Sequence, residues 1–281
     1  MFPVHQLKLY PMKNFASIVC VLTVSAQLSA QKIIHQEVFS AKMNKNIKTI
    51  IITPDVQQGA TYPSIYILHG YSGNPERTIK QDIPDLIQKA QEYKTIYVLP
   101  DGNYNSWYVD SPLVKDSQYQ TFIGQELVDF VNKSYPVKND RKFRGILGWS
   151  MGGYGAVNIG TTYNDTFGIV GSSCGALDFN SFGPGYTQYQ VDKVLGSAIS
   201  LNPKFLTDNK VKTMATAEQQ YIFDCGTEDT QMIEMNRKFH KKLTDLKIPH
   251  LYIESLGAHD PQYWSRSLSE QLTLFNQFFN H

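Results

Sequence analysis

The chain has 281 residues, of which 42% are hydrophobic and 18% are charged. This composition is typical of a globular protein, and the length suits one α/β domain with a sizeable core. The formal net charge is +1 and the sequence has no basic run, so the charge pattern argues against binding to nucleic acid or to an anionic membrane surface.

The first thirty residues have the pattern of a secretory signal peptide. Lys13 precedes an apolar run, Phe15 to Val24, which is too short to span a bilayer. Small residues follow, and we expect cleavage after Ala30 or after Ala26. Translation could also start at Met12 rather than at the first residue. The pattern predicts an exported protein, periplasmic or secreted, that does not insert into the membrane once the signal is removed.

Apolar strands and amphipathic helices alternate through residues 31–281, which we expect to form one domain. The strands are continuous apolar runs, as expected when helices cover both faces of a parallel sheet. The first part of the chain predicts an antiparallel strand pair at 33–39 and 46–54, strands at 64–68 and 95–99, and helices at 82–93 and 119–135.

Two loops follow the strands at 64–68 and 95–99. The first begins with His69, which we expect to order the loop rather than to act as a catalytic base. The second is rich in aromatic and polar residues, and the carboxyl edge of an open α/β sheet is where ligands bind. We therefore consider Trp107, Tyr108 and Asp110 as candidate substrate-binding residues. The alternative is that the aromatic side chains of this loop pack on their own domain.

Residues 143–156 have the pattern of a nucleophile elbow. An apolar strand at 143–147 leads into Gly148-Trp149-Ser150-Met151-Gly152, and a helix follows. This is the G-x-S-x-G motif in its expected strand-to-helix context. A serine hydroxyl at such a sharp turn stands clear of the sheet, and the two glycines leave room where a Cβ would clash. The pattern predicts Ser150 as a nucleophile.

The run from Gly148 to Ala156 resembles the esterase D-like branch of the α/β-hydrolases. That branch includes S-formylglutathione hydrolases, tributyrin esterases, mycolyltransferases of the antigen 85 type, and the acetyl-xylan and feruloyl esterases of carbohydrate esterase family 1. The resemblance extends from about Ile47 to the C-terminus. It implies an α/β-hydrolase fold with a mostly parallel central sheet, helices on both faces and a small cap insertion. The wording Ser-Trp-Tyr-x-Asp-Ser-Pro in the aromatic loop is similar to that of the carbohydrate esterases.

The backbone N–H of Met151 at the start of the helix and an N–H of the loop after the strand at 64–68 can converge on one developing oxyanion. The resemblance implies that the loop donor is the N–H of Tyr71.

The second half of the chain continues the alternation around an irregular stretch. We expect strands at 167–173 and 251–255, and between them a strand that begins at Gln220 and breaks into an acidic turn ending at Asp229. A helix at 233–246 and a terminal helix with an apolar face complete the pattern. Residues 179–217 lack clear periodicity and predict a cap insertion over the cleft rather than a second domain. Cys174 and Cys225 lie at strand ends, where we expect free, packed thiols. The sequence has no metal-ligand cluster of Cys and His.

The histidine partner of Ser150 must lie downstream, because α/β-hydrolases order their catalytic residues as Ser, then Asp or Glu, then His. The chain has seven histidines, and His259 alone lies in the loop after the last strand. Its expected task is to take the serine proton and later return it to the leaving group.

The acid is open to more than one interpretation. Asp229 follows the penultimate strand in Gly-Thr-Glu-Asp, where the family carries its acid, and it is our prediction. Asp178, one strand earlier, is the main rival. Asp224 lies inside the strand and could point into the sheet, whereas Glu228 would face away if Asp229 faces the site.

These residues together predict a serine carboxylic-ester hydrolase that acts through an acyl-enzyme without a metal or another cofactor. We expect its substrate to be a small ester or a plant polysaccharide decorated with acetyl or feruloyl groups. The alternatives are a general short-chain acyl esterase of the tributyrin type, an acyltransferase to a sugar, and a non-catalytic carbohydrate-binding protein. The sequence leaves the oligomeric state open.

Overall fold

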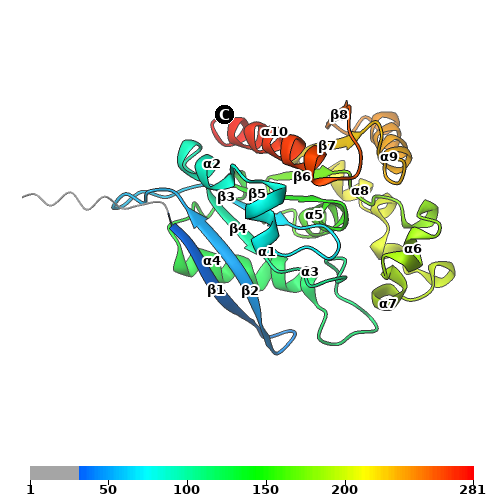
Figure 1. Cartoon of the computed structure of the whole chain (residues 1–281), viewed down its shortest axis with the longest axis horizontal. Helices are drawn as coiled ribbons and strands as arrows, with labels where there is room; N and C mark the ends of the chain where they lie inside the picture. Colours follow the sequence, from blue (N-terminus) through cyan, green and yellow to red (C-terminus); the bar gives the residue numbers. More distant parts are fainter. Residues whose placement is uncertain (1–31) are drawn as a thin grey trace, which may run out of the picture.

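The computed structural model describes residues 32–281, and its centre is one eight-stranded sheet (Figure 1). The strand order is β1-β2-β4-β3-β5-β6-β7-β8. β1 pairs with β2, and β2 with β4, in antiparallel fashion, whereas all other neighbours are parallel. The strands are β1 (Lys32–Ser40), β2 (Lys45–Thr53), β3 (Ser64–Leu68), β4 (Ile96–Pro100), β5 (Arg144–Trp149), β6 (Ile169–Ser173), β7 (Gln220–Gly226) and β8 (Leu251–Ser255).

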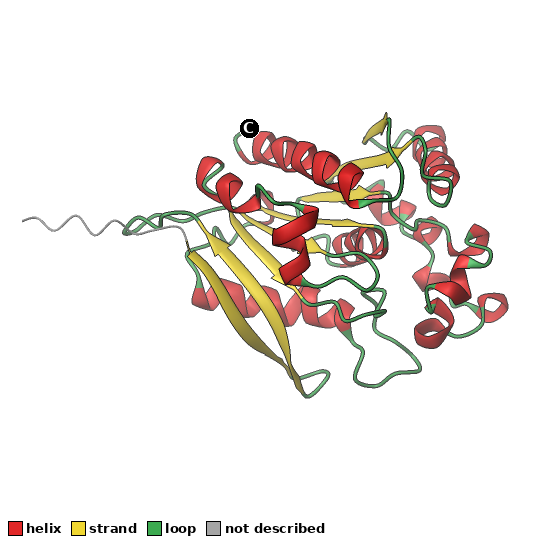
Figure 2. Ribbon diagram, in the orientation of Figure 1, coloured by secondary structure: helices red, strands yellow, loops and turns green. Residues whose placement is uncertain are grey.

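Helices cover both faces of this sheet, as the continuous apolar strands predict. Helices α2 (Leu86–Glu92) and α10 (Pro261–Phe279) lie over one face, and α4 (Leu127–Ser134) and α5 (Met151–Thr162) lie over the other (Figure 2). Helix α9 (Ile233–Asp245) packs beside β7. The terminal helix buries the predicted apolar face, which includes Leu268, Leu272 and Phe275. The observed architecture is the predicted α/β-hydrolase fold.

Two predicted helices differ from their expected form. The helix expected at 82–93 begins only at Leu86, after a separate π-helical turn, η1 (Thr78–Asp82), that continues α1 (Pro75–Arg77). The break falls at Ile83, which precedes Pro84 and has φ −140° and ψ 73°, because the residue before a proline is disfavoured in the helical region. The helix expected at 119–135 is present as α3 (Tyr119–Thr121), the π-helical turn η2 (Phe122–Glu126) and α4.

The stretch at 179–217 folds into short helices joined by loops, at one end of the sheet (Figure 1). These are η4 (Phe179–Ser181), α6 (Gly185–Gln188), α7 (Val191–Leu195), η5 (Ala198–Ser200), η6 (Pro203–Phe205), η7 (Thr207–Asn209) and α8 (Val211–Met214). Its aromatic side chains pack on one another, as Phe179 does with Phe182 and Phe182 with Tyr189. Phe179 and Phe182 also pack edge-on against Trp107 of the main domain, with ring centroids 5.3 and 5.8 Å away.

The signal peptide predicted for residues 1–30 lies outside the described residues. Within residues 32–281, no helix is long and apolar enough to cross a bilayer. The predicted state of the two cysteines is confirmed, because Cys174 and Cys225 are both free and buried.

Candidate active site

Ser150 stands at a strained turn between β5 and α5. Its backbone has φ 55° and ψ −117°, a conformation that L-residues rarely adopt and that turns the side chain out of the sheet. The glycines of the motif are required by packing. A Cβ on Gly148 would overlap the backbone of Gly152, and a Cβ on Gly152 would overlap the carbonyl of Leu68 at the end of β3. The local sequence therefore fixes the position of the hydroxyl.

A chain of two hydrogen bonds connects Ser150 with the two other predicted residues. Nε2 of His259 lies 2.9 Å from Oγ of Ser150, and Nδ1 of His259 lies 2.6 Å from Oδ2 of Asp229. The residues come from the loops after β5, β7 and β8, and the carboxyl ends of these parallel strands meet at one edge of the sheet. The structure thus brings together side chains that are up to 109 positions apart in the sequence.

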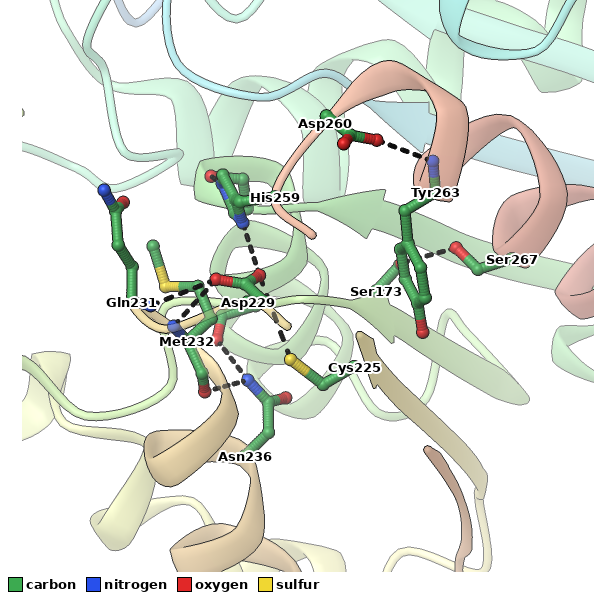
Figure 3. Close-up of polar contacts among 12 residues, drawn as sticks. Ser173, Cys225, Asp229, Gln231, Met232, Asn236, His259, Asp260, Tyr263 and Ser267 are labelled. Carbon is green, nitrogen blue, oxygen red and sulfur yellow. Dashed lines mark hydrogen bonds and ion pairs between the residues drawn. The ribbon is translucent and has the colours of Figure 1, made fainter. Parts of the chain in front are cut away.

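Asp229 is held by the turn that precedes α9 (Figure 3). Its Oδ1 accepts hydrogen bonds from the backbone N–H of Gln231 at 3.2 Å and of Met232 at 3.0 Å. Oδ2 is left for His259 and for the thiol of Cys225, which lies 3.9 Å away. Every acceptor position of this buried carboxylate is directed by backbone or by a neighbouring donor, so the carboxylate can orient the imidazole ring.

His259 is positioned from the other side by α10. The next residue, Asp260, is the N-cap of this helix, and its carboxylate accepts the N–H of Tyr263 at 2.9 Å (Figure 3). The ring of Trp264 packs edge-on against the imidazole, with centroids 5.1 Å apart. His259 therefore directly precedes the N-cap of α10, and its ring packs against the ring of Trp264.

The rival acids lie elsewhere. Asp178 caps the short helix η4 and pairs with Lys238 and with Ser181. Asp224 is buried within the sheet layer, where its carboxylate accepts hydrogen bonds from Ser173, Tyr263 and Gln271. Glu228 is exposed to solvent. Only Asp229, among these four carboxylates, is hydrogen-bonded to His259.

The Asp229–His259 pair favours the charged forms of both groups. Burial favours the neutral forms, but the hydrogen bond to His259 and its charge lower the pKa of Asp229 below the ordinary value. Burial also opposes protonation of His259, but the hydrogen bonds to Asp229 and to Cys174 raise the pKa of the imidazole above its ordinary value. An imidazole with this environment is a strong base toward a hydroxyl 2.9 Å away.

The loop after β3 lies directly beside Ser150. A Cβ on Gly70 would come 3.5 Å from the Cβ of Ser150, and the following residue, Tyr71, lines the same pocket as Ser150. Among the described residues, neither the N–H of Tyr71 nor that of Met151 has a hydrogen-bond acceptor. His69 orders the loop as expected: it is buried, and its Nε2 accepts the N–H of Gly102 at 2.8 Å.

A pocket of about 220 Å³ opens at Ser150 and His259. Its lining also includes four residues that carry no sequence signal of a functional role, namely Arg77, Asp82, Tyr189 and Trp264. Tyr189 belongs to the insertion at 179–217, and its ring packs edge-on against that of Tyr71 with centroids 5.3 Å apart. No motif marks these residues, and only the aromatic character of the insertion and of the terminal helix could have drawn attention to two of them.

The interpretation of Trp107, Tyr108 and Asp110 as substrate-binding residues is corrected by the structure. The side chain of Trp107 is 1% exposed and donates to the carbonyl of Tyr189, whereas Tyr108 is fully buried with its hydroxyl on the carbonyl of His69. Asp110 accepts hydrogen bonds from the N–H and the hydroxyl of Thr121. None of the three lines the pocket.

The physical reason is that the loop at 100–112 turns inward and fills the space between the sheet and the insertion. Trp107 and Tyr108 therefore pack on their own domain, which is the alternative that the sequence left open, whereas Tyr104 of the same loop is 52% exposed.

One group of side chains in residues 32–281 could provide three ligands for a metal ion. Donor atoms of Cys174, Asp229 and His259 lie within 4.8 Å of one another. Two of the three residues are already hydrogen-bonded to each other in the chain that leads to Ser150.

The fold and the geometry at Ser150 define an α/β-hydrolase with a Ser-His-Asp constellation at the carboxyl edge of its sheet. Comparison with known proteins agrees with this class. Residues 40–275 match the Esterase family, and the chain belongs to this family. The protein is a carboxylic ester hydrolase.

Individual relatives are distant in sequence. The chain is 27% identical over 223 residues to an acetyl esterase of Caldicellulosiruptor saccharolyticus, which covers 73% of this chain and 80% of the relative. It is 25% identical over 235 residues to the esterase Rv1288 of Mycobacterium tuberculosis, where the match covers 74% of this chain but only 51% of that protein.

Solved structures show the same fold. An S-formylglutathione hydrolase of Staphylococcus aureus superposes with a TM-score of 0.77 at 20% identity, covering 88% of this chain and 99% of that one. A ferulic acid esterase has a TM-score of 0.73 at 23% identity and covers 89% of this chain and 98% of its own. A ferulic acid esterase of Anaeromyces mucronatus has a TM-score of 0.65 at 18% identity, and the match covers 92% of this chain and 94% of that one.

Proposed function

We propose that the protein is a serine esterase that acts through an acyl-enzyme, with Ser150 as nucleophile, His259 as general base and Asp229 as the acid that orients the base. The observation that carries this proposal is the chain of hydrogen bonds, 2.6 and 2.9 Å long, that ends at a strained and pocket-lining serine.

In the first half of the reaction, Nε2 of His259 takes the proton of the Ser150 hydroxyl while Oγ attacks the ester carbonyl. The negative charge that develops on the carbonyl oxygen is stabilised by the N–H groups of Tyr71 and Met151, which are free to donate. The imidazolium, held by Asp229, then returns the proton to the leaving alkoxide. In the second half, His259 activates water in the same way, and the acid product is released.

The substrate that we propose is an acetyl or feruloyl ester on plant polysaccharide. The aromatic loop at 100–112 no longer supports this choice, because Trp107 and Tyr108 are buried and neither they nor Asp110 line the pocket. Support for an acetyl or feruloyl ester comes from an acetyl esterase among the relatives and from ferulic acid esterases among the structures of the same fold, which also include an S-formylglutathione hydrolase. We also propose that the protein is exported, on the basis of the apolar run Phe15 to Val24 and its flanks. N-terminal sequencing of the protein from the culture medium or periplasm would test export, and an intact first residue in the cytoplasm would contradict it.

Activity on an aryl acetate tests the catalytic part of the proposal. Ser150→Ala should lose nearly all hydrolysis of 4-nitrophenyl acetate while it keeps the wild-type circular dichroism spectrum. Residual activity of a tenth or more would contradict the role of Ser150. A fluorophosphonate probe should label the wild type at Ser150 and leave the variant unlabelled, and failure to label the wild type would favour a non-catalytic protein.

Substrate preference requires a separate comparison. Acetylated xylan and methyl ferulate should be hydrolysed with higher kcat/KM than tributyrin. A clear preference for tributyrin would replace the polysaccharide assignment with a general short-chain esterase. Product analysis in the presence of xylose or trehalose would reveal acyl transfer to a sugar.

A further inference from the structure

A buried polar network lies where β6, β7 and α10 meet, and its centre is Asp224 of β7. This side chain is 2% exposed, and a charged group in such a place is costly unless it has hydrogen-bonding partners. Burial raises the pKa of Asp224 to about 6 although its hydrogen bonds oppose the shift, so the group is a carboxylate at neutral pH. The proposed catalytic steps do not use this carboxylate, because His259 is paired with Asp229.

Both oxygens of Asp224 accept hydrogen bonds from buried side chains. Oδ1 accepts the hydroxyl of Ser173 on β6 at 2.7 Å and that of Tyr263 on α10 at 3.0 Å, and Oδ2 accepts the side-chain amide of Gln271. Because Ser173 gives its only hydroxyl proton to Asp224, Ser267 donates to Ser173 across their 2.7 Å contact (Figure 3). Tyr263, Ser267 and Gln271 are four positions apart and therefore lie on one face of α10.

The strand side of the network is continuous with the nucleophile and the acid. The carbonyl of Ser173 accepts the backbone N–H of Ser150 at 3.0 Å, so the residue that donates its hydroxyl to Asp224 also holds the nucleophile turn. Asp229 lies in the turn that follows β7, the strand of Asp224. The ladder between β6 and β7 fixes these two segments relative to each other.

The base depends on the helix side of the network. His259 directly precedes α10, and this helix packs on the sheet through apolar side chains such as Leu268. Apolar packing is non-directional, whereas hydrogen bonds to a charged carboxylate are directional and stronger than neutral ones. Tyr263, in the first turn of α10, makes such a bond, and its own N–H is capped by Asp260, the residue after His259. The network therefore fixes the start of α10 against β6 and β7.

We propose that Asp224 is a positioning residue that holds His259 at hydrogen-bonding distance from Ser150, because it attaches the first turn of α10 to the strands of the nucleophile and the acid. The proposal rests on the proposed function and deepens it by adding a residue that does not line the pocket. Nε2 of His259 lies 2.9 Å from Oγ of Ser150. A misplacement of about 1 Å is enough to lower a rate about a hundredfold.

Tyr263→Phe removes one hydroxyl from the network and leaves the buried ring in place. We expect kcat on 4-nitrophenyl acetate to fall about tenfold, with KM within about twofold of the wild type, because the pocket is unchanged. Ser269→Ala is the matched control. It also removes from α10 a hydroxyl that donates to a carboxylate, that of Asp85 at 2.9 Å, but this bond lies outside the network, and kcat should stay within about twofold.

The carboxylate itself is tested by two substitutions. Asp224→Ala frees all three donors and should lower kcat by about a hundredfold at unchanged KM. Asp224→Asn is the conservative variant. Its Oδ1 keeps Ser173 and Tyr263, and its amide can donate to Oε1 of Gln271, which has no donor among the described residues, so kcat should recover to within about fivefold of the wild type. All rates are measured where circular dichroism shows the variants to be folded.

A spectroscopic readout separates the position of the base from the stability of the fold. The proton between Nδ1 of His259 and Asp229, whose atoms are 2.6 Å apart, should give a low-field proton resonance that is absent from His259→Gln. In Tyr263→Phe and Asp224→Ala we expect this resonance to move upfield, because the start of α10 shifts and the hydrogen bond lengthens. In Ser269→Ala it should keep the wild-type position.

The proposal is overturned if folded Tyr263→Phe and Asp224→Ala both keep the wild-type kcat and the wild-type resonance, which would make the network a stabilising element only. If Asp224→Ala does not fold, Tyr263→Phe and its control decide alone. An equal loss of kcat in Ser269→Ala would also contradict the proposal. If the wild type hydrolyses no ester, the proposed function fails, and the resonance, which requires no substrate, still reports whether Asp224 positions His259.

Discussion

The substitution Asp229→Asn tests the geometry of the catalytic chain most directly. Asparagine has the same shape, and its Oδ1 can keep the hydrogen bonds from the N–H groups of Gln231 and Met232. Its Nδ2 then takes the place of the oxygen that lies 2.6 Å from Nδ1 of His259. Because an amide nitrogen donates, the ring must present Nδ1 as an acceptor and carry its proton on Nε2, toward Ser150. In that tautomer the imidazole cannot accept the serine proton.

The expected loss is a factor of about 10³ to 10⁴ in kcat, or about 4 to 5 kcal/mol of transition-state stabilisation. The pH profile provides a second readout. Only the neutral ring acts as a base, so kcat/KM rises with pH through the pKa of His259, and the carboxylate of Asp229 moves this rise above pH 6.5. At an effective dielectric constant of about 20, unit charges about 4 Å apart interact by about 4 kcal/mol, or roughly three pKa units, which burial partly offsets. The midpoint in Asp229→Asn should therefore fall by about one to three pH units.

Initial rates on 4-nitrophenyl acetate, corrected for spontaneous hydrolysis, give both quantities. Asp178→Asn is the matched control, because Asp178 pairs with Lys238 away from the pocket, and its kcat should stay within about twofold of the wild type. A loss in Asp229→Asn of less than tenfold, or a midpoint that moves upward, would refute the assigned role. A large loss in Asp178→Asn with an active Asp229→Asn would transfer the role to the rival acid.

Three further substitutions test other parts of the structure. Gly152→Ala places a methyl group on the backbone carbonyl of Leu68, so we expect a loss of about 4 kcal/mol or more in the free energy of unfolding, measured by urea denaturation, and a wild-type midpoint would contradict the packing. Trp107→Ala should lower the free energy of unfolding by about 3 to 5 kcal/mol, because the side chain is buried. The KM for 4-nitrophenyl acetate should stay within about threefold of the wild type. A large change in KM in a stable variant would restore a substrate-binding role. Asp260→Ala removes the cap of α10 and should lower both kcat and the melting temperature, with a loss of about 1 kcal/mol in the free energy of unfolding. Asp260→Asn keeps a capping oxygen and should keep most of both. Equal behaviour of the two variants would show that the cap does not position His259.

Most of the fold could be predicted from the sequence, because the apolar strands are continuous and the strand boundaries are marked by glycine and proline. The strands at 64–68 and 251–255 have the predicted bounds, and the other strands differ by a few residues at their ends. The π-helical turns could not be predicted, since they depend on how α1 and α3 continue into the next segment. The break before Leu86 has a local cause in Pro84, and the pattern of apolar residues at helical spacing concealed it.

The catalytic constellation was predictable for a different reason. The position of Ser150 depends on a turn that leaves no room for a side chain at Gly148 or Gly152, and both glycines are visible in the sequence. The positions of His259 and Asp229 follow from chain order and from the ends of parallel strands, which meet at one edge. The roles assigned to the aromatic loop at 100–112 were wrong because a sequence does not indicate whether a loop at that edge points toward the pocket or into the core.

The residues that form the wall of the pocket could not be predicted from the sequence. A nucleophile requires a particular backbone conformation, and that requirement restricts the residue types around it. Arg77, Asp82, Tyr189 and Trp264 line the pocket only because packing brings them there, and no residue near them in the sequence has to change as a result. Asp82 comes from the π-helical turn η1, Tyr189 from the insertion at 179–217, and Trp264 from the terminal helix α10. The turn that holds Ser150 is therefore marked in the local sequence. The remaining walls of the pocket are formed by contacts between distant segments, and only the folded chain displays them.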